Sequence, residues 1–152
     1  MNIQTLATYF NLEDSTVADT FCDQGTLAIT YEVGAHILLD GMTFSGNFAS
    51  QIGSVCLFSG LGDETILSNL RIADSGFYEP LSACSICVSS SSNLKLLNIS
   101  LTKLTDDNVP TTAKISVSAN LLQINNVSFS ENIAYRPQDG SLIQAIAAAN
   151  PI

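Results

Sequence analysis

The sequence predicts an all-β protein, a right-handed parallel β-helix (solenoid) with coils of about 28 residues. Large apolar landmark residues recur at separations of 28, 29 and 28 residues, and each ends a stretch in which apolar and small polar side chains alternate. Prolines at 80, 110 and 137 follow three landmarks by eight, nine and eight residues, which marks one phase of each coil as a loop. The landmarks are Phe44, Ile72, Leu101 and Phe129.

Each coil is expected to contain two or three short strands. Alternation with period two predicts strands at 39–44, 67–72, 96–101 and 124–129. Second strands are expected after the loops, at 54–58, 85–88, 114–117 and 141–145. Coils stacked about 4.8 Å apart place the landmarks in one interior column. A second column then contains Met42, Leu70, Ile99 and Val127.

The position three residues before each landmark predicts a polar ladder. It holds Gly41, Asn69, Asn98 and Asn126, and identical amides in stacked β structures hydrogen-bond to one another. We expect this ladder to face inward. Asn98-Ile99-Ser100 and Asn126-Val127-Ser128 match the glycosylation sequon, but inward asparagines argue against modification.

The repeat weakens near the start of the chain. We expect residues 1–36 to form an irregular N-terminal coil or cap and residues 37–152 to form the regular coils, together making one domain. An irregular end coil protects the outer strand edge from pairing with other chains.

Composition narrows the classes of partner. The formal net charge is −9 with only five basic residues, which argues against nucleic acid as a partner. No apolar run reaches the roughly 20 residues of a membrane span, so we expect no membrane insertion by this chain.

A short motif follows the first and last landmarks. It is Phe-x-x-Asn, formed by Phe44 with Asn47 and by Phe129 with Asn132. In structural terms, Phe fills the interior column and Asn bonds backbone groups at the corner. A glycine-led strand follows each copy, beginning Gly53-Ser54-Val55 and Gly140-Ser141-Leu142.

This pairing of motifs resembles the polymorphic membrane proteins of chlamydiae, autotransporters whose passenger regions repeat Phe-x-x-Asn and Gly-Gly-Ala-(Ile/Leu/Val). The resemblance covers roughly residues 37 to 145. The glycine motif lacks its second Gly and its Ala, and the coils that contain Ile72 and Leu101 have lost Phe-x-x-Asn.

The resemblance implies a cell-surface adhesin, a secreted passenger fragment located at the bacterial cell surface or outer membrane. Its partner is then a host-cell surface protein, contacted through the longer loops at 45–52, 74–83, 102–112 and 130–139. Tyr78, Tyr135 and Arg136 are the candidate contact residues. Strand edges at the two ends of the fragment favour self-association.

Nothing in the sequence indicates a catalytic centre, a metal or a cofactor. His36 is the only histidine and lacks neighbouring nucleophiles or paired carboxylates, so we interpret it as a strand-edge residue. The alternatives to a binding module are a β-helical polysaccharide lyase or hydrolase of the tailspike kind, which requires acids gathered on adjacent coils, and a structural spacer.

The cysteines are expected to be buried as small apolar residues. Cys84 and Cys87 form Cys-x-x-Cys, but an offset of three places strand side chains on opposite faces, which argues against zinc or thioredoxin chemistry. If Val55 stacks on Ile86, Cys56 lies beside Cys87 in the next coil. Cys56 and Cys87 are therefore the candidate disulfide.

Overall fold

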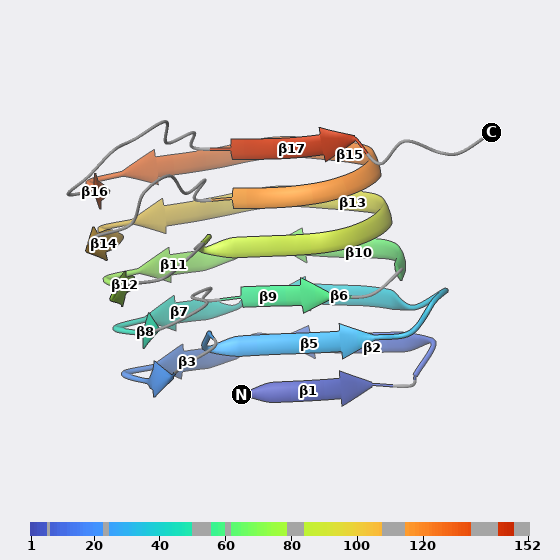
Figure 1. Cartoon of the computed structure of the whole chain (residues 1–152), viewed down its shortest axis with the longest axis horizontal. Helices are drawn as coiled ribbons and strands as arrows, with labels where there is room; N and C mark the ends of the chain where they lie inside the picture. The colour runs from blue at the N-terminus through green and yellow to red at the C-terminus, as the bar shows by residue number, and fades with distance from the viewer. Residues whose placement is uncertain are drawn as a thin grey trace.

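The chain is a stack of parallel β coils, seen in a computed structural model that describes residues 1–5, 7–22, 25–49, 56–59, 62–78, 84–107, 115–134 and 143–147 (Figure 1). All regular elements in these ranges are strands, and the described strands pair in parallel. The described residues include no helix long and apolar enough to cross a membrane. The prediction of an all-β parallel solenoid with coils of about 28 residues is confirmed.

Each coil has four sides, which we call the first to fourth faces in chain order. The first three faces belong to one 12-stranded sheet, and the fourth is a separate 5-stranded sheet. The first face stacks β1 (Asn2–Thr5), β5 (Leu27–Tyr31), β9 (Cys56–Ser59), the start of β13 (Ile86–Thr102), the start of β15 (Ile115–Ser130) and β17 (Ile143–Ala147).

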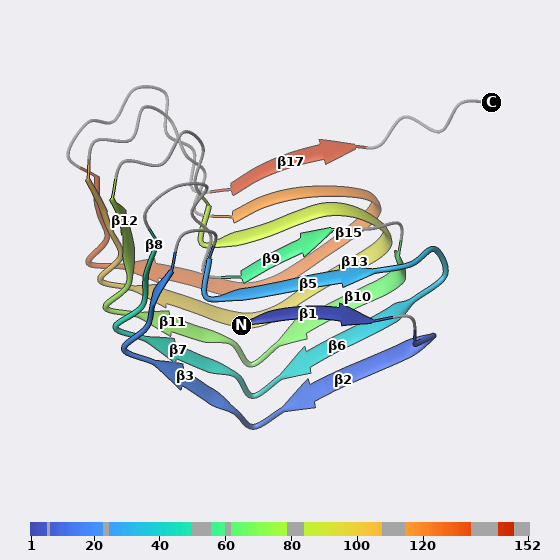
Figure 2. The same ribbon diagram turned by 60° about the horizontal axis from the view of Figure 1, so that its bottom comes forward.

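The second and third faces meet at a sharp bend (Figure 2). The second face stacks β2 (Tyr9–Glu13), β6 (His36–Asp40), β10 (Gly62–Ser68) and the middle parts of β13 and β15. The third face stacks β3 (Thr16–Ala18), β7 (Thr43–Ser45), β11 (Arg71–Ala73) and the ends of β13 and β15.

The fourth face consists of very short strands that the sequence pattern did not reveal. They are β4 (Phe21–Cys22), β8 (Phe48–Ala49), β12 (Gly76–Tyr78), β14 (Thr105–Asp107) and β16 (Ile133–Ala134). The predicted loops at 45–52, 74–83, 102–112 and 130–139 therefore begin with a corner and a strand, and only their later parts lie outside the described residues. Two- and three-residue strands are too short to show period-two alternation.

The landmark column exists as predicted. Ile72 pairs in register with Phe44 on one side and with Leu101 on the other, and Leu101 pairs with Phe129. Phe44, Ile72 and Leu101 are fully buried, while Phe129 in the last coil is partly buried. The column of Met42, Leu70 and Ile99 is buried beside it, with Val127 partly buried at its end. Stacked apolar columns thus make one continuous core.

Two rows of residues with positive φ turn the chain between faces. The row between the second and third faces, which we call the Asn corner, contains Asp14, Gly41, Asn69, Asn98 and Asn126. The row between the third and fourth faces contains Asp19, Gly46, Asp74, Lys103 and Glu131. Gly, Asn and Asp tolerate this left-handed conformation better than other residue types, which explains their prevalence at both corners.

The coil at 9–22 lies in register with the next one. Tyr9 pairs with His36 and Val17 with Phe44, and Phe10, Leu12 and Val17 pack against the core. β13 runs through the serine-rich stretch 89–93, and its register with β15 shifts there between Val88 and Ser91.

Candidate binding surface

A chain of polar and aromatic side chains crosses the second face on its outer side. The rings of Tyr9 and His36 are stacked with centroids 4.9 Å apart. His36 Nδ1 lies 3.8 Å from Glu64 Oε2, and Lys95 Nζ donates to Glu64 Oε1 at 2.8 Å. The hydrogen bond from Lys95 holds the pKa of Glu64 below its ordinary value of 4.5. These contacts join four coils across an exposed surface.

A pocket of about 390 Å³ opens beside this chain, toward the C-terminal end of the stack. Glu64 and Lys95 form its polar side, and Leu94, Leu121 and Leu122 its apolar side. Asn93 and Gln123 complete the lining. The pocket combines one ion pair with exposed leucines, a composition suited to binding an amphipathic partner.

The first Phe-x-x-Asn motif has the structural role expected of it. Asn47 is fully buried, and its Nδ2 donates to the carbonyl of Val17 at 2.8 Å. Its Oδ1 accepts from the backbone N–H of Thr20 at 3.0 Å and from the Thr20 hydroxyl at 2.8 Å. The side chain therefore satisfies backbone groups of the preceding coil where the chain turns onto the fourth face.

The second motif repeats this arrangement in the last coil. Asn132 Nδ2 donates to the carbonyl of Leu101 at 3.1 Å, and its Oδ1 accepts from the N–H of Leu104 at 2.8 Å. In the coil of Ile72, which lacks the Asn, Ser75 is buried at the equivalent place and its Oγ accepts from the N–H of Asn47 at 3.2 Å. Phe-x-x-Asn thus links neighbouring coils.

The asparagine ladder exists, but the prediction that it faces inward is wrong. Asn126 Nδ2 donates to Asn98 Oδ1 and Asn98 Nδ2 to Asn69 Oδ1, both at 3.0 Å, and all three residues are exposed. Asn69 Nδ2 and the Ser68 hydroxyl donate to Asp40, and these bonds lower the pKa of Asp40 below its ordinary 3.8. Positive φ at the corner turns these side chains outward, so burial no longer argues against modification of the two sequons.

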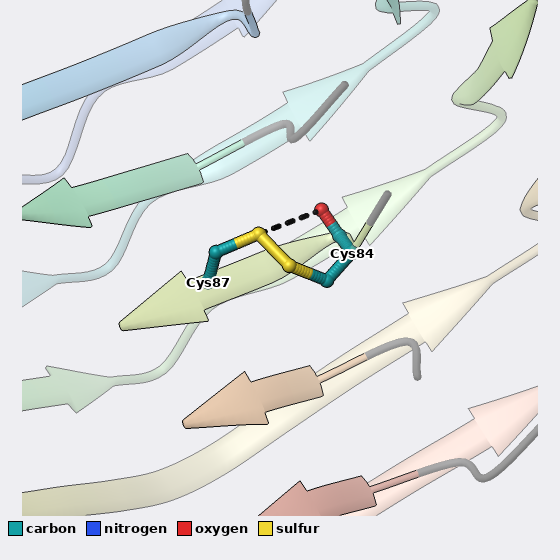
Figure 3. Close-up of a disulfide and its surroundings, with 2 residues drawn as sticks. All are labelled: Cys84 and Cys87. Carbon is teal, nitrogen blue, oxygen red and sulfur yellow. Dashed lines mark hydrogen bonds between the residues drawn. A yellow bond between two sulfur atoms is a disulfide. The ribbon is translucent and has the colours of Figure 1, made fainter. Parts of the chain in front are cut away.

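The predicted disulfide between Cys56 and Cys87 is wrong. Cys84 and Cys87 are bonded to each other, with their Cα atoms 5.7 Å apart (Figure 3). Cys84 precedes β13, so the strand rule that separates residues three apart does not apply to it. Cys56 pairs with Ile86, one residue from the expected register. Cys22, partly exposed, is a free thiol whose Sγ lies 3.8 Å from the carbonyl oxygen of Phe48.

The predicted contact residues and glycine motifs fall mostly outside the described residues. Tyr78 is the last residue of β12, paired with Asp107. Tyr135 and Arg136 lie outside the described ranges. So do the members of both glycine motifs, Gly53, Ser54, Val55, Gly140, Ser141 and Leu142. Within the described ranges no group of three or more His, Cys, Asp or Glu side chains is placed to hold a metal ion.

The C-terminal end of the stack exposes an apolar strand edge, which we call the C-terminal edge and define as residues 120–130 of β15. β13 pairs with β15 along nearly its whole length, but β17 covers only residues 115–119. No other described strand covers 120–130. Leu121, Leu122 and Ile124 are 67%, 37% and 41% exposed as a result. The edge contains no charged residue.

The N-terminal end, formed by β2 and β3, presents a different edge. Glu13, Asp14 and Asp19 lie along it with exposed side chains. Tyr9 is exposed as well, while Phe10 and Leu12 are only partly buried against the core. Charged residues on an edge strand oppose pairing with other strands, so this end is the protected one.

No protein-family model, curated protein or solved structure matches the chain. The resemblance to chlamydial polymorphic membrane proteins therefore stays a prediction that rests on its motifs.

The sequence analysis expected exposed strand edges at both ends of the fragment but did not locate them at particular residues. Residues 122–129 have the same alternation as the buried strands 94–101, and nothing in their composition distinguishes them from an internal coil. Only the pairing pattern shows that no described strand lies over this edge.

Proposed function

We propose that this chain is a non-enzymatic binding module, a cell-surface adhesin passenger fragment that contacts a host-cell surface protein. The observation that supports the proposal is the position of the four long connecting segments. They join β8 to β9, β12 to β13, β14 to β15 and β16 to β17. β8, β12, β14 and β16 are stacked, and β9, β13, β15 and β17 are stacked, so the strands that bound all four segments form two neighbouring rows.

A row of neighbouring segments along one edge suits recognition of a protein surface. Stacked strands hold the ends of these segments at fixed spacing, and connecting segments on a rigid scaffold often carry binding residues. Tyr78 ends the strand before the second segment, and Tyr135 and Arg136 belong to the fourth segment in the sequence, so residue types enriched in interfaces occur in or beside these segments. Secretion to a bacterial surface is part of the same proposal.

The test is adhesion of the chain, coated on beads, to cultured host cells. We expect removal of residues 135–137 to reduce adhesion strongly while far-ultraviolet circular dichroism stays unchanged. Asn69→Gly is the matched control, because Asn69 lies at the Asn corner, away from this edge, and glycine accepts its positive φ. Unchanged adhesion after the deletion, or no adhesion by the parent chain, would refute the proposal, and the second result would favour a spacer.

A further inference from the structure

The disulfide between Cys84 and Cys87 lies at the start of β13, on the first face. Cys84 precedes the strand, and Cys87 is its second residue. Because Ile86 and Val88 are buried in the core, Cys87 between them faces the outer side of the coil. Both half-cystines are partly exposed. Thiols in the surrounding solution therefore have access to this bond, and access is one condition for thiol–disulfide exchange.

The architecture of the rod does not depend on the bond. β13 pairs with β9 on one side and with β15 on the other at Ile86, Cys87 and Val88. The bond joins residues only three apart in the sequence. A loop this short constrains the unfolded chain little, because the entropic stabilisation by a disulfide grows with the number of residues that it encloses. Reduction should therefore leave the coils paired and the core intact.

The contacts of the sulfur atoms also suit the reduced state. Cys87 Sγ lies 3.4 Å from the carbonyl oxygen of Cys84, the contact dashed in Figure 3. In the disulfide this sulfur carries no hydrogen, whereas a reduced Cys87 has a thiol that donates to the same oxygen. The reduced site thus has a hydrogen bond available without movement of Cys87.

Ser85 provides a second, independent observation at this site. Its side chain is fully buried, and its Oγ makes no hydrogen bond with any residue that the structure describes. Thr26 occupies the same position on the first face two coils earlier and is also buried. There the hydroxyl oxygen of Thr26 accepts from the hydroxyl of Thr20 at 3.4 Å. Burial of an unpaired hydroxyl is unfavourable, so the inward position of Ser85 must be maintained by its neighbours.

The reason for the missing partner lies at the preceding corner. Ser75 has the place in this coil that Thr20 has in the first, directly before the strand of the fourth face. Its hydroxyl donates to the carbonyl of Ala73 at 2.8 Å and accepts from the N–H of Asn47 at 3.2 Å. Ser85 is left without the bond that Thr26 makes, and the covalent link between the residues that flank positions 85 and 86 keeps it inward.

We propose that Cys84 and Cys87 form a thiol–disulfide exchange site for dithiol reductants, and that reduction releases Ser85 from the interior while the coils stay folded. A thiolate of the reductant bonds to one of the two sulfurs, the S–S bond breaks, and the other sulfur leaves as a thiolate and takes a proton. The second thiolate of the reductant then displaces the first sulfur. Both cysteines end as thiols and the reductant as a disulfide, with two electrons transferred to the chain.

The release is confined to one place on the rod. The chain contains no other pair of cysteines three residues apart, so only the entry to β13 is closed by such a loop. On release, the Ser85 hydroxyl gains hydrogen bonds to water, which favours the open position once the covalent link is gone. The proposal concerns Cys84 to Cys87 and does not depend on adhesion.

The first experiment tests reduction of the folded chain. The whole chain is treated with about 1 mM dithiothreitol and then with iodoacetamide, and mass spectrometry locates the alkylated cysteines. We expect both Cys84 and Cys87 to be alkylated while far-ultraviolet circular dichroism stays unchanged. The rate should lie within about tenfold of the rate in urea, because unfolding is not required. Reduction only in urea, or loss of the β spectrum on reduction, would overturn the proposal.

The second experiment tests the release of Ser85. A soluble paramagnetic agent enhances the nuclear relaxation of protons that water reaches, so it measures exposure of the Ser85 Cβ protons in the oxidised and reduced chains. We expect the enhancement to rise at least about twofold on reduction, and we expect no rise at Leu67 in the core. An unchanged enhancement at Ser85 would refute the release.

Two variants serve as matched tests of the cause. Ser85→Ala removes the unpaired hydroxyl, so the side chain at position 85 should stay buried in both redox states. Cys84→Ala with Cys87→Ala should expose Ser85 without any reductant, and Cys84→Ser with Cys87→Ser replaces this pair if circular dichroism shows misfolding. Equal release in Ser85→Ala and the parent chain, or a buried Ser85 in the variants that lack both cysteines, would contradict the mechanism. No cells are involved, so failure of the adhesin proposal and failure of this one remain distinguishable.

Discussion

The terminal strands at the two ends of the solenoid differ in charge. At both ends, one side of these strands is not paired with any described strand. The N-terminal end carries Glu13, Asp14 and Asp19 along its edge, whereas residues 120–130 at the other end carry no charge. In one column the exposed fraction rises from 0% at Leu67 to 41% at Ile124. Position in the stack, rather than residue type, therefore determines whether an apolar side chain in this column is buried or exposed in the described structure.

The largest effect on the free energy of unfolding is expected from truncations within one side-chain column. Leu67 lies in the middle of this column and Ile124 at its C-terminal end. Leu67→Ala removes a side chain packed between coils on both sides, and we expect a loss of about 2–5 kcal/mol in the free energy of unfolding. Ile124→Ala should cost less than about 1 kcal/mol, because much of that side chain is already exposed. Urea denaturation followed by circular dichroism measures both. Equal losses would mean that the C-terminal edge is covered in solution.

The second comparison uses the two Phe-x-x-Asn motifs. Asn47→Leu leaves the buried N–H of Thr20 and the carbonyl of Val17 without their partner, and we expect it to cost roughly 2–4 kcal/mol. Asn132→Leu removes two similar bonds near the C-terminal end, where water reaches the side chain, and should cost about 1 kcal/mol. The same denaturation experiment applies. A larger loss for Asn132 would show that the last coil stabilises the rod more than the second.

Smaller effects are expected at the Asn corner. Replacement by glycine keeps positive φ accessible and removes only the side chain, so Asn98→Gly breaks two ladder bonds and Asn126→Gly one. We expect losses of about 1 kcal/mol and about 0.5 kcal/mol in unfolding free energy, since these bonds are exposed. Identical values for the two variants would indicate that the ladder contributes nothing beyond the backbone conformation.

The smallest effect should be the pH dependence of the middle coils. The folded-state pKa values of Asp40 and Glu64 lie below the ordinary 3.8 and 4.5, because Ser68 and Lys95 respectively donate hydrogen bonds to them. Their contribution is therefore fully present above about pH 4.5 and is lost as the pH falls through the folded-state values. Unfolding midpoints measured from pH 7 to pH 3 should decline less in Asp40→Asn with Glu64→Gln than in the parent chain. An equal decline in the variant and the parent chain would mean that groups other than Asp40 and Glu64 cause the acid sensitivity.

The sequence predicted the landmark column because inward apolar residues in every coil share one spacing, and the structure pairs Phe44, Ile72, Leu101 and Phe129 as expected. On the first face, the predicted register was wrong by one residue, because Cys56 rather than Val55 pairs with Ile86. Connecting segments of unequal length change the separation there, so Ile86 follows Cys56 by 30 residues although Ile72 follows Phe44 by 28. A periodic count cannot detect such local changes.

The outward direction of the asparagines could have been inferred. Inward residues at 37 and 39 are two apart, those at 39 and 42 are three apart, and those at 42 and 44 are again two apart. A three-residue step in a strand marks a corner, and the residue types at that step favour positive φ. The C-terminal edge had no such marker, because its burial depends on a strand that would have to come from outside the described coils.

The most direct test of the account is amide hydrogen exchange measured residue by residue along the chain. The stack of parallel coils predicts slow exchange for the amides of 64–68, which pair with a strand on each side, and faster exchange for alternate amides of 9–13, which pair with one described strand only. Equally fast exchange in these two strands would contradict the stacked architecture.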